Sequence, residues 1–197
     1  GGHPQYAFYT GVAAGIYLLC RVIASRCFRL PAIGFGVIYI GGGLLSTVQW
    51  LTGMQSMGET VRAGELSFGF ASMFSFPPEN LITLFAPRFF GGAGELPYWG
   101  RCYLWEMCLF ISITALVLAV YGAVKGLRRR EWIEPVAVAV LFLFALGAHT
   151  PLFTVLYHGV PGFDMFRGIS KFIFPMSLFL ALLAGKGLSD LKGSGKP

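Results

Sequence analysis

Two basic residues with the spacing of one helical turn are the first feature that could do chemistry. Arg167 and Lys171 stand four positions apart in the stretch FRGISKF, residues 166–172. A helix there would place both side chains on one face. Such a pair suits a phosphate or a diphosphate, because a guanidinium binds two phosphate oxygens at once. The alternative interpretation is that both cations only contact anionic lipid at a membrane surface.

A lone carboxylate is the second such feature. Glu106 follows Trp105 about one turn inside an apolar run, and Arg101 is near it in the sequence. A carboxylate in this position can orient an acceptor hydroxyl or bind a metal ion. The alternative is that it snorkels to the interface or pairs with Arg101. Glu106 is therefore the candidate catalytic residue of the chain.

Histidine and cysteine give little sign of a metal centre. His3, His149 and His158 are scattered along the chain, and the four cysteines form no C-x-x-C pair. Structural zinc sites need ligands at closer and more regular spacing. The sequence predicts no metal site from these residues. It also contains no P-loop, G-x-S-x-G, H-E-x-x-H or Rossmann motif.

The composition excludes an ordinary soluble domain and a disordered chain. Of the 197 residues, 55% are hydrophobic and only 12% are charged, whereas soluble domains carry about a quarter charged residues. The mean hydropathy is +0.68. The net charge of +6 could indicate nucleic acid, but basic residues of membrane proteins mark their cytoplasmic loops. We expect an all-α, polytopic membrane protein that binds membrane lipids and no nucleic acid.

About five segments are apolar and long enough to cross a bilayer. They cover residues 5–24, 31–51, 102–124, 133–157 and 172–188. The segment 52–101 between the second and third spans is expected to be an extracytoplasmic loop that contains short interfacial helices. Pro151 is expected to bend or break the fourth span. Two G-x-x-x-G matches, at Gly11 and at Gly122, are expected to allow close helix packing.

The distribution of Lys and Arg sets the orientation of these spans. Ten basic residues follow spans one, three and five, whereas the opposite ends balance five basic residues with five acidic ones. The positive-inside rule then places the residue 1 end outside and the residue 197 end in the cytoplasm. The middles of all five spans lack Asp, Glu, Lys and Arg. Polar side chains gather instead at the outer rim, so a site at the outer membrane surface is predicted.

Short motifs along most of the chain carry a family resemblance. In order, they are GHPQ at 2–5, PPENL at 77–81, APRFFG at 86–91, YWGR at 98–101, WE at 105–106, TPL at 150–152, PGF at 161–163 and FR at 166–167. In order and spacing these motifs resemble the YfhO-like family of bacterial multispanning membrane proteins, over residues 2 to about 188. The resemblance implies a multi-pass protein of the bacterial cytoplasmic membrane.

The resemblance also implies an activity. It is that of a GT-C-type glycosyltransferase, which takes a sugar from a polyprenyl-phosphate-linked donor and transfers it to a cell-wall polymer or lipid outside the cytoplasm. Arg167 and Lys171 would then bind the donor phosphate, Glu106 and Arg101 would organise the site, and His3 would support it. A divalent metal is the alternative means of holding the phosphate charge. The family's acidic residue lies in the first extracytoplasmic loop, so we expect the general base to precede residue 1 in a longer enzyme.

Two other classes of function compete with the enzyme. A lipid or polymer transporter, or a flippase-like component, would need a polar path through the membrane, and the apolar span middles argue against one in this chain. A non-enzymatic scaffold of the cell envelope would use the 52–101 loop only as a docking surface. The presence of an acidic residue in the first outer loop would favour the enzyme over the scaffold.

Overall fold

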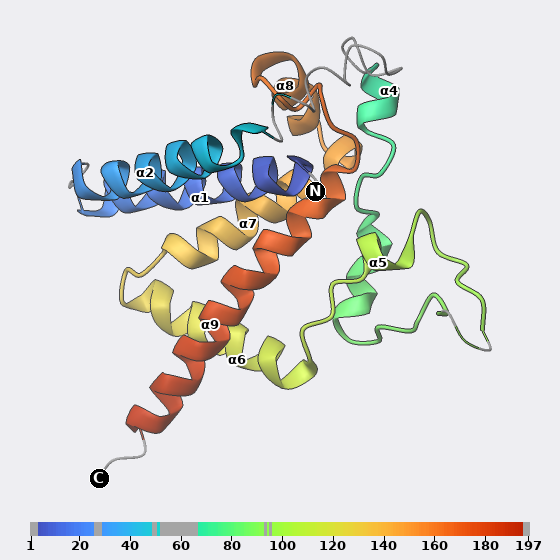
Figure 1. Cartoon of the computed structure of the whole chain (residues 1–197). Coiled ribbons are helices and arrows are strands. Elements are labelled where there is room, and N and C mark those ends of the chain that lie inside the picture. Colours follow the sequence, from blue (N-terminus) through green and yellow to red (C-terminus); the bar gives the residue numbers. More distant parts are fainter. Residues whose placement is uncertain are drawn as a thin grey trace.

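Helices are the regular secondary structure of the described part of the chain. The computed structural model describes residues 4–25, 29–48, 51, 67–92, 94 and 96–194, and within these ranges it contains no strand, only an isolated bridge between Gly92 and Pro97. Figure 1 shows the resulting arrangement of helices. The all-α class predicted from the sequence is confirmed.

The helices fall into five long ones, three short ones and three 3₁₀ turns within the described residues. The long helices are α1 (Pro4–Ser25), α2 (Arg29–Leu45), α6 (Ile113–Arg128), α7 (Ile133–Ala145) and α9 (Ile173–Ser194). The short helices are α4 (Phe68–Ala71), α5 (Leu104–Met107) and α8 (Leu152–Gly159). The 3₁₀ turns are η1 (Pro78–Leu84), η2 (Gly147–His149) and η3 (Ile169–Phe172).

Helix α9 packs mainly against α6 and α7. Its closest approach to α6 depends on two glycines. A Cβ atom on Gly122 would overlap the α9 backbone at Leu183 and Gly187, and one on Gly187 would overlap the α6 backbone at Leu118. Small residues let two helix backbones approach closely in this way. The close packing predicted at Gly122 is confirmed.

Helices α1 and α2 form a hairpin on the other side of α7 (Figure 1). Helix α1 packs against α7 and α9, whereas α2 packs chiefly against α1 and buries none of its residues. A Cβ atom on Gly11 of α1 would stand 3.0 Å from the ring of Tyr39 of α2, whereas one on Gly15 would meet none of the described residues within 4 Å. Only the first glycine of this G-x-x-x-G match therefore serves helix contact.

The buried core lies where α1 begins and α7 ends. Phe172 is at its centre, with ring centroids 4.5 Å from Tyr9, 5.3 Å from Phe144 and 6.0 Å from Phe163. Each such ring contributes about 1.5–3 kcal/mol when it is fully buried. These rings hold η3 against α1 and α7, and η3 carries one of the predicted site residues.

Within the described residues, two helices are long and apolar enough to cross a membrane. They cover Gln5–Ala24 and Ile169–Gly193, and α2 and α7 are shorter apolar helices. The first and last predicted spans therefore correspond to long helices. Helix α2 ends at Leu45, and the rest of the predicted second span includes residues 49 and 50, which lie outside the described residues.

The third predicted span is wrong as a continuous helix, and the fourth, which was expected to bend or break at Pro151, is broken from Gly147 on, with Pro151 at the start of α8. The third begins at Ile113 rather than at residue 102, because Ser112 caps α6 by accepting a hydrogen bond from the Ala115 amide and the preceding residues are extended. The fourth is divided into α7, η2 and α8. Gly147 takes a left-handed φ of +50°, so the helix is interrupted before Pro151 is reached.

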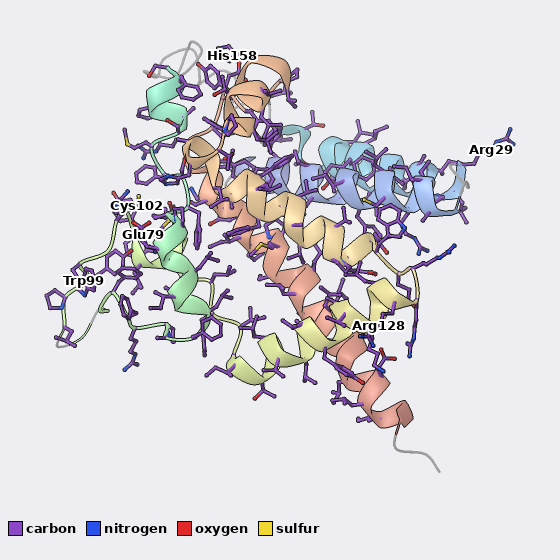
Figure 2. The ribbon with its side chains drawn as sticks, turned by 180° about the vertical axis from the view of Figure 1, so that it is seen from behind. Arg29, Glu79, Trp99, Cys102, Arg128 and His158 are labelled. Carbon is purple, nitrogen blue, oxygen red and sulfur yellow. The ribbon has the colours of Figure 1, made fainter. Side chains whose placement is uncertain are left out.

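The molecule has two chemically different ends. In Figure 2, Arg29 and Arg128 lie on one side, and Glu79, Trp99 and Cys102 lie on the opposite side. The start of α2 and the end of α6 thus share a basic end. The start of α1 and the start of α9 meet away from that end (Figure 1).

Candidate functional site

Three side chains from distant segments meet beside the start of α9. The Lys171 Nζ of η3 lies 3.1 Å from Glu106 Oε1 of α5 and donates to Gln5 Oε1 of α1 over 3.2 Å. The Lys171 and Glu106 side chains are only 13% and 15% exposed. Low exposure strengthens such an ion pair and makes the loss of either partner costly. We call Lys171, Glu106 and Gln5 the polar triad.

A left-handed glycine makes room for the polar triad. Gly168 has φ +83°, and a Cβ atom there would stand 3.2 Å from Lys171 Nζ and 3.7 Å from Gln5 Nε2. Residues with side chains rarely adopt this backbone conformation. The Lys171 amide then donates to the Gly168 carbonyl over 3.2 Å, which closes η3. The Ser170 amide donates to the Phe74 carbonyl over 3.1 Å, so η3 is also tied to the segment after α4.

Arg167 lies at the surface beside the polar triad. Its guanidinium carbon is 5.3 Å from the Phe70 ring centroid and 5.4 Å from that of Phe74. Its backbone carbonyl accepts a hydrogen bond from Gln5 Nε2. In the parts of the chain that the structure describes, Arg167 forms no ion pair, so its exposed guanidinium charge is available to an anion.

The predicted helical turn between Arg167 and Lys171 is wrong, although both residues belong to one cluster. Helix η3 begins only at Ile169, and the left-handed Gly168 separates Arg167 from it. The two cations are connected instead through Gln5, which contacts both residues. Sequence analysis placed Gln5 at the outer rim but gave it no role, because a contact over more than 160 positions leaves no local pattern.

The pairing of Glu106 with Arg101, which was the alternative interpretation of this carboxylate, is not observed. Arg101 Nε lies 3.1 Å from Glu79 Oε1, and both side chains are exposed. Exposed ion pairs contribute about 0–1 kcal/mol. Glu106 lies in α5, outside α6, and pairs with Lys171. His3, predicted to support the site, lies outside the described residues.

Stacked aromatic rings extend from Arg167 along the surface. The Phe74 ring stacks on Tyr103 at 5.5 Å, and Tyr103 stacks on Trp105 at 5.0 Å. Trp105 is 76% exposed. A second aromatic group lies in the same segment between α4 and α6, where the ring centroids of Phe90 and Trp99 are 4.9 Å apart. Exposed tryptophan and tyrosine at a molecular end are typical of a membrane interface.

Cys102 lies in the chain between Arg101 and α5, which carries Glu106. Burial raises the pKa of its thiol, the Glu106 carboxylate raises this pKa further, and the Arg101 guanidinium opposes the rise. The thiol is thus held in its neutral form at neutral pH. Among the residues that the structure describes, no three His, Cys, Asp or Glu side chains are grouped so that they could hold a metal ion.

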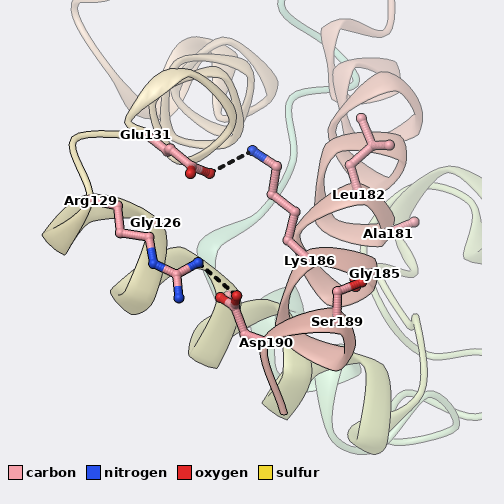
Figure 3. A pocket seen from close by; sticks show the side chains of 10 residues that line it. Gly126, Arg129, Glu131, Ala181, Leu182, Gly185, Lys186, Ser189 and Asp190 are labelled. Atoms are coloured by element: carbon pink, nitrogen blue, oxygen red, sulfur yellow. Dashed lines mark hydrogen bonds and ion pairs between the residues drawn. The ribbon is translucent and has the colours of Figure 1, made fainter. Parts of the chain in front are cut away.

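A groove of about 500 Å³ lies between α6 and α9 at the basic end (Figure 3). Its charged residues are matched across the helices. Arg129 binds Asp190 over 2.7 Å, and Lys186 binds Glu131 over 3.2 Å and Glu134 over 3.0 Å. Every cation that lines the groove therefore has a carboxylate partner. These pairs hold the α6–α7 turn on α9, and we assign them a structural role.

Comparison of the chain with protein-family models, with curated proteins and with solved structures finds no match. The resemblance to the YfhO-like family accordingly rests on the sequence motifs.

Proposed function

We propose that this chain belongs to a membrane glycosyltransferase of the GT-C type. It would take a sugar from a polyprenyl-phosphate-linked donor and transfer it to a cell-envelope polymer or lipid outside the cytoplasm. The observation that carries the proposal is the exposed guanidinium of Arg167, which forms no ion pair within the described residues and is held beside the largely buried Lys171.

The proposal places the protein in the bacterial cytoplasmic membrane as a bundle of about five spans. It is supported by the large apolar side chains that point outward from α1, α2, α6 and α9, among them Leu19, Ile38, Val117 and Leu178. Lipid can cover such side chains, whereas water cannot do so without cost. In the proposed orientation the start of α2, which carries Arg29, and the end of α6, which carries Arg128, face the cytoplasm. The polar triad then faces outward.

Two cationic groups of different kinds would bind the donor phosphate. The Arg167 guanidinium presents a planar, bidentate donor set, and the Phe70 and Phe74 rings beneath it reduce its freedom before a ligand arrives. The Lys171 ammonium supplies a second positive charge when it exchanges its Glu106 contact for a phosphate oxygen. Helices α1 and α9 both begin here, and helix starts carry partial positive charge that favours an anion.

The neighbouring aromatic surface suits a lipid-linked substrate. Tyr103, Trp105 and Trp99 would lie at the outer membrane interface, with α5 and η1 parallel to the surface. A prenyl chain needs apolar surface next to the site that holds its phosphate. The stacked rings that begin at Phe74 supply such a surface directly beside Arg167.

In the proposed reaction the acceptor hydroxyl oxygen forms a bond to the anomeric carbon of the donor sugar. The bond from that carbon to the phosphate oxygen breaks, its electron pair leaves with the polyprenyl phosphate, and a carboxylate takes the hydroxyl proton. Arg167 and Lys171 stabilise the charge that develops on the phosphate. Glu79 pairs with Arg101, and Glu106 pairs with Lys171 in the absence of a donor. We assign Glu106 the orientation of Lys171 before the donor binds, and we assign the proton to neither carboxylate.

The test is a sugar-transfer assay on the complete protein in membranes, with labelled polyprenyl-phosphate sugars. Arg167→Ala should lower transfer at least tenfold, and Arg167→Lys should recover part of it, because one cation remains without the bidentate geometry. Arg128→Ala is the matched control, since it removes an exposed arginine from the opposite end. Unchanged transfer by a well-inserted Arg167→Ala protein would exclude Arg167 from the site.

A further inference from the structure

The amide of Gln5 connects the two cationic residues of the proposed phosphate site. Its Oε1 accepts a hydrogen bond from Lys171 Nζ over 3.2 Å. Its Nε2 donates one hydrogen bond to the Arg167 carbonyl and another to the Tyr9 hydroxyl, the latter over 3.1 Å. Both N–H groups and the carbonyl oxygen of one side chain are thus in use.

The Gln5 amide is itself anchored to the core. Tyr9 is only 2% exposed, and its ring lies 4.5 Å from that of Phe172. Because the buried Tyr9 ring holds its hydroxyl in place, the Gln5 amide that donates to this hydroxyl is restricted as well. Gln5 therefore extends from a rigid base, one helical turn away on α1, to the two cationic residues at the surface.

The chemistry of position 5 is specific to glutamine. Glutamate has the same shape and can accept from Lys171, but it has no N–H group for the Arg167 carbonyl. Leucine makes neither contact. Asparagine carries the same amide on a side chain one methylene shorter, so its reach falls by roughly 1.3–1.5 Å. Only glutamine both accepts from the ammonium and donates to the carbonyl at this distance.

We infer that Gln5 is the positioning residue that sets the separation of Arg167 and Lys171 for the donor phosphate. Lys171 keeps its Gln5 contact while it exchanges Glu106 for a phosphate oxygen, so the ammonium stays next to Arg167 during the exchange. The left-handed turn at Gly168 is held by the same amide through the Arg167 carbonyl. This inference rests on the proposed function.

The test compares a phosphate-bearing lipid with its uncharged alcohol. The complete protein in phosphatidylcholine nanodiscs is titrated with decaprenyl phosphate and, separately, with decaprenol. The wild type should bind the phosphate at least tenfold more tightly than the alcohol. Gln5→Leu and Gln5→Glu should lose about tenfold in phosphate affinity and keep the affinity for decaprenol. Thr10→Val, which removes an exposed hydroxyl from the same helix, should change neither affinity.

Each outcome decides between the two proposals. A wild type without preference for the phosphate would overturn the proposed phosphate site, and with it the role of Gln5. A wild-type preference that Gln5→Leu and Gln5→Glu both retain would overturn the role of Gln5 alone. If the variants lose decaprenol affinity in parallel, Gln5 acts only in maintaining the fold, which also overturns the inference. In the transfer assay, the expected effect is a raised KM for the donor with a smaller change in kcat.

Discussion

The ammonium of Lys171 lies 3.1 Å from the carboxylate of Glu106, and both side chains are largely withdrawn from solvent. This pair connects η3 to α5. Helix η3 is held in the aromatic core, whereas α5 belongs to the segment between α4 and α6. This charge pair therefore helps to hold α5, which was predicted to be part of the third span, against the helix bundle.

Removal of one partner of this pair should destabilise the protein more than removal of both. Glu106→Gln and Lys171→Met should each cost about 2 kcal/mol, because each leaves a poorly hydrated partner without its counter-charge. The double variant should cost less than either single variant, and hence much less than the sum of the two. Thermal unfolding of the purified protein in detergent measures all three. Simple additivity would contradict a direct interaction between these side chains.

The thiol of Cys102 should report the charge of its neighbours. Since the Glu106 carboxylate raises the pKa of this thiol and the Arg101 guanidinium lowers it, Glu106→Gln should shift the pH dependence of alkylation to lower pH. Arg101→Gln should shift it to higher pH. The measurement is the rate of iodoacetamide labelling between about pH 7 and 10, on a protein whose other cysteines are replaced by serine. Shifts in the same direction for both variants would contradict the arrangement.

Two glycines of α9 that are two positions apart should respond in opposite ways to alanine. Gly187→Ala should destabilise the protein by a few kcal/mol, about 2–4, because its methyl group would meet the α6 backbone. Gly185→Ala meets nothing within 4 Å, so it should be neutral or should stabilise by up to about 1 kcal/mol through helix propensity. Thermal unfolding of the two variants side by side measures the difference. Equal effects would mean that α6 and α9 do not cross at Gly187.

The two ends of the molecule should face opposite sides of the membrane. In a cysteine-free background, Trp99→Cys should react with an impermeant maleimide in intact cells. Arg128→Cys should react only after the cells are broken. Both positions are exposed in the structure, so a lack of labelling in intact cells cannot come from burial. Labelling of both in intact cells, or the reverse pattern, would refute the proposed orientation.

The sequence predicts the helices that consist of one uninterrupted apolar run. It does not predict helix ends that depend on the backbone conformation of a few residues. Helices α1 and α9 match their predicted spans because their composition alone defines them. The start of α6 was missed because Leu104, Trp105 and Met107 continue the apolar run of the span, although they belong to the separate helix α5. The break in the fourth span was expected at Pro151 and not at Gly147, because a glycine within an apolar run can be helical or can end a helix.

The site was predictable only where it is local in sequence. The spacing of Arg167 and Lys171 correctly placed them in one cluster, although the helix expected between them is absent. The partners Gln5 and Glu106 come from other helices, and nothing in their own surroundings marks them as neighbours of Lys171. Charge pairs between helices are set by tertiary packing, so the Arg101–Glu79 pair could not be predicted either.

The length of α7 determines how a lipid-linked donor would arrive. Its 13 residues rise about 20 Å, less than the roughly 30 Å of hydrocarbon in a bilayer. In the orientation that we propose, the turn after Ala145 lies below the outer surface, where unpaired backbone groups are costly. Phe76 and Ser75 reach in to bind the Ala145 carbonyl and the Ala148 amide, each over 2.8 Å. The segment that carries Ser75 and Phe76 thus supplies the hydrogen-bond partners that hydrocarbon could not supply at the end of α7. In the proposed function, a prenyl-linked donor would meet this covered end of α7 from within the outer leaflet.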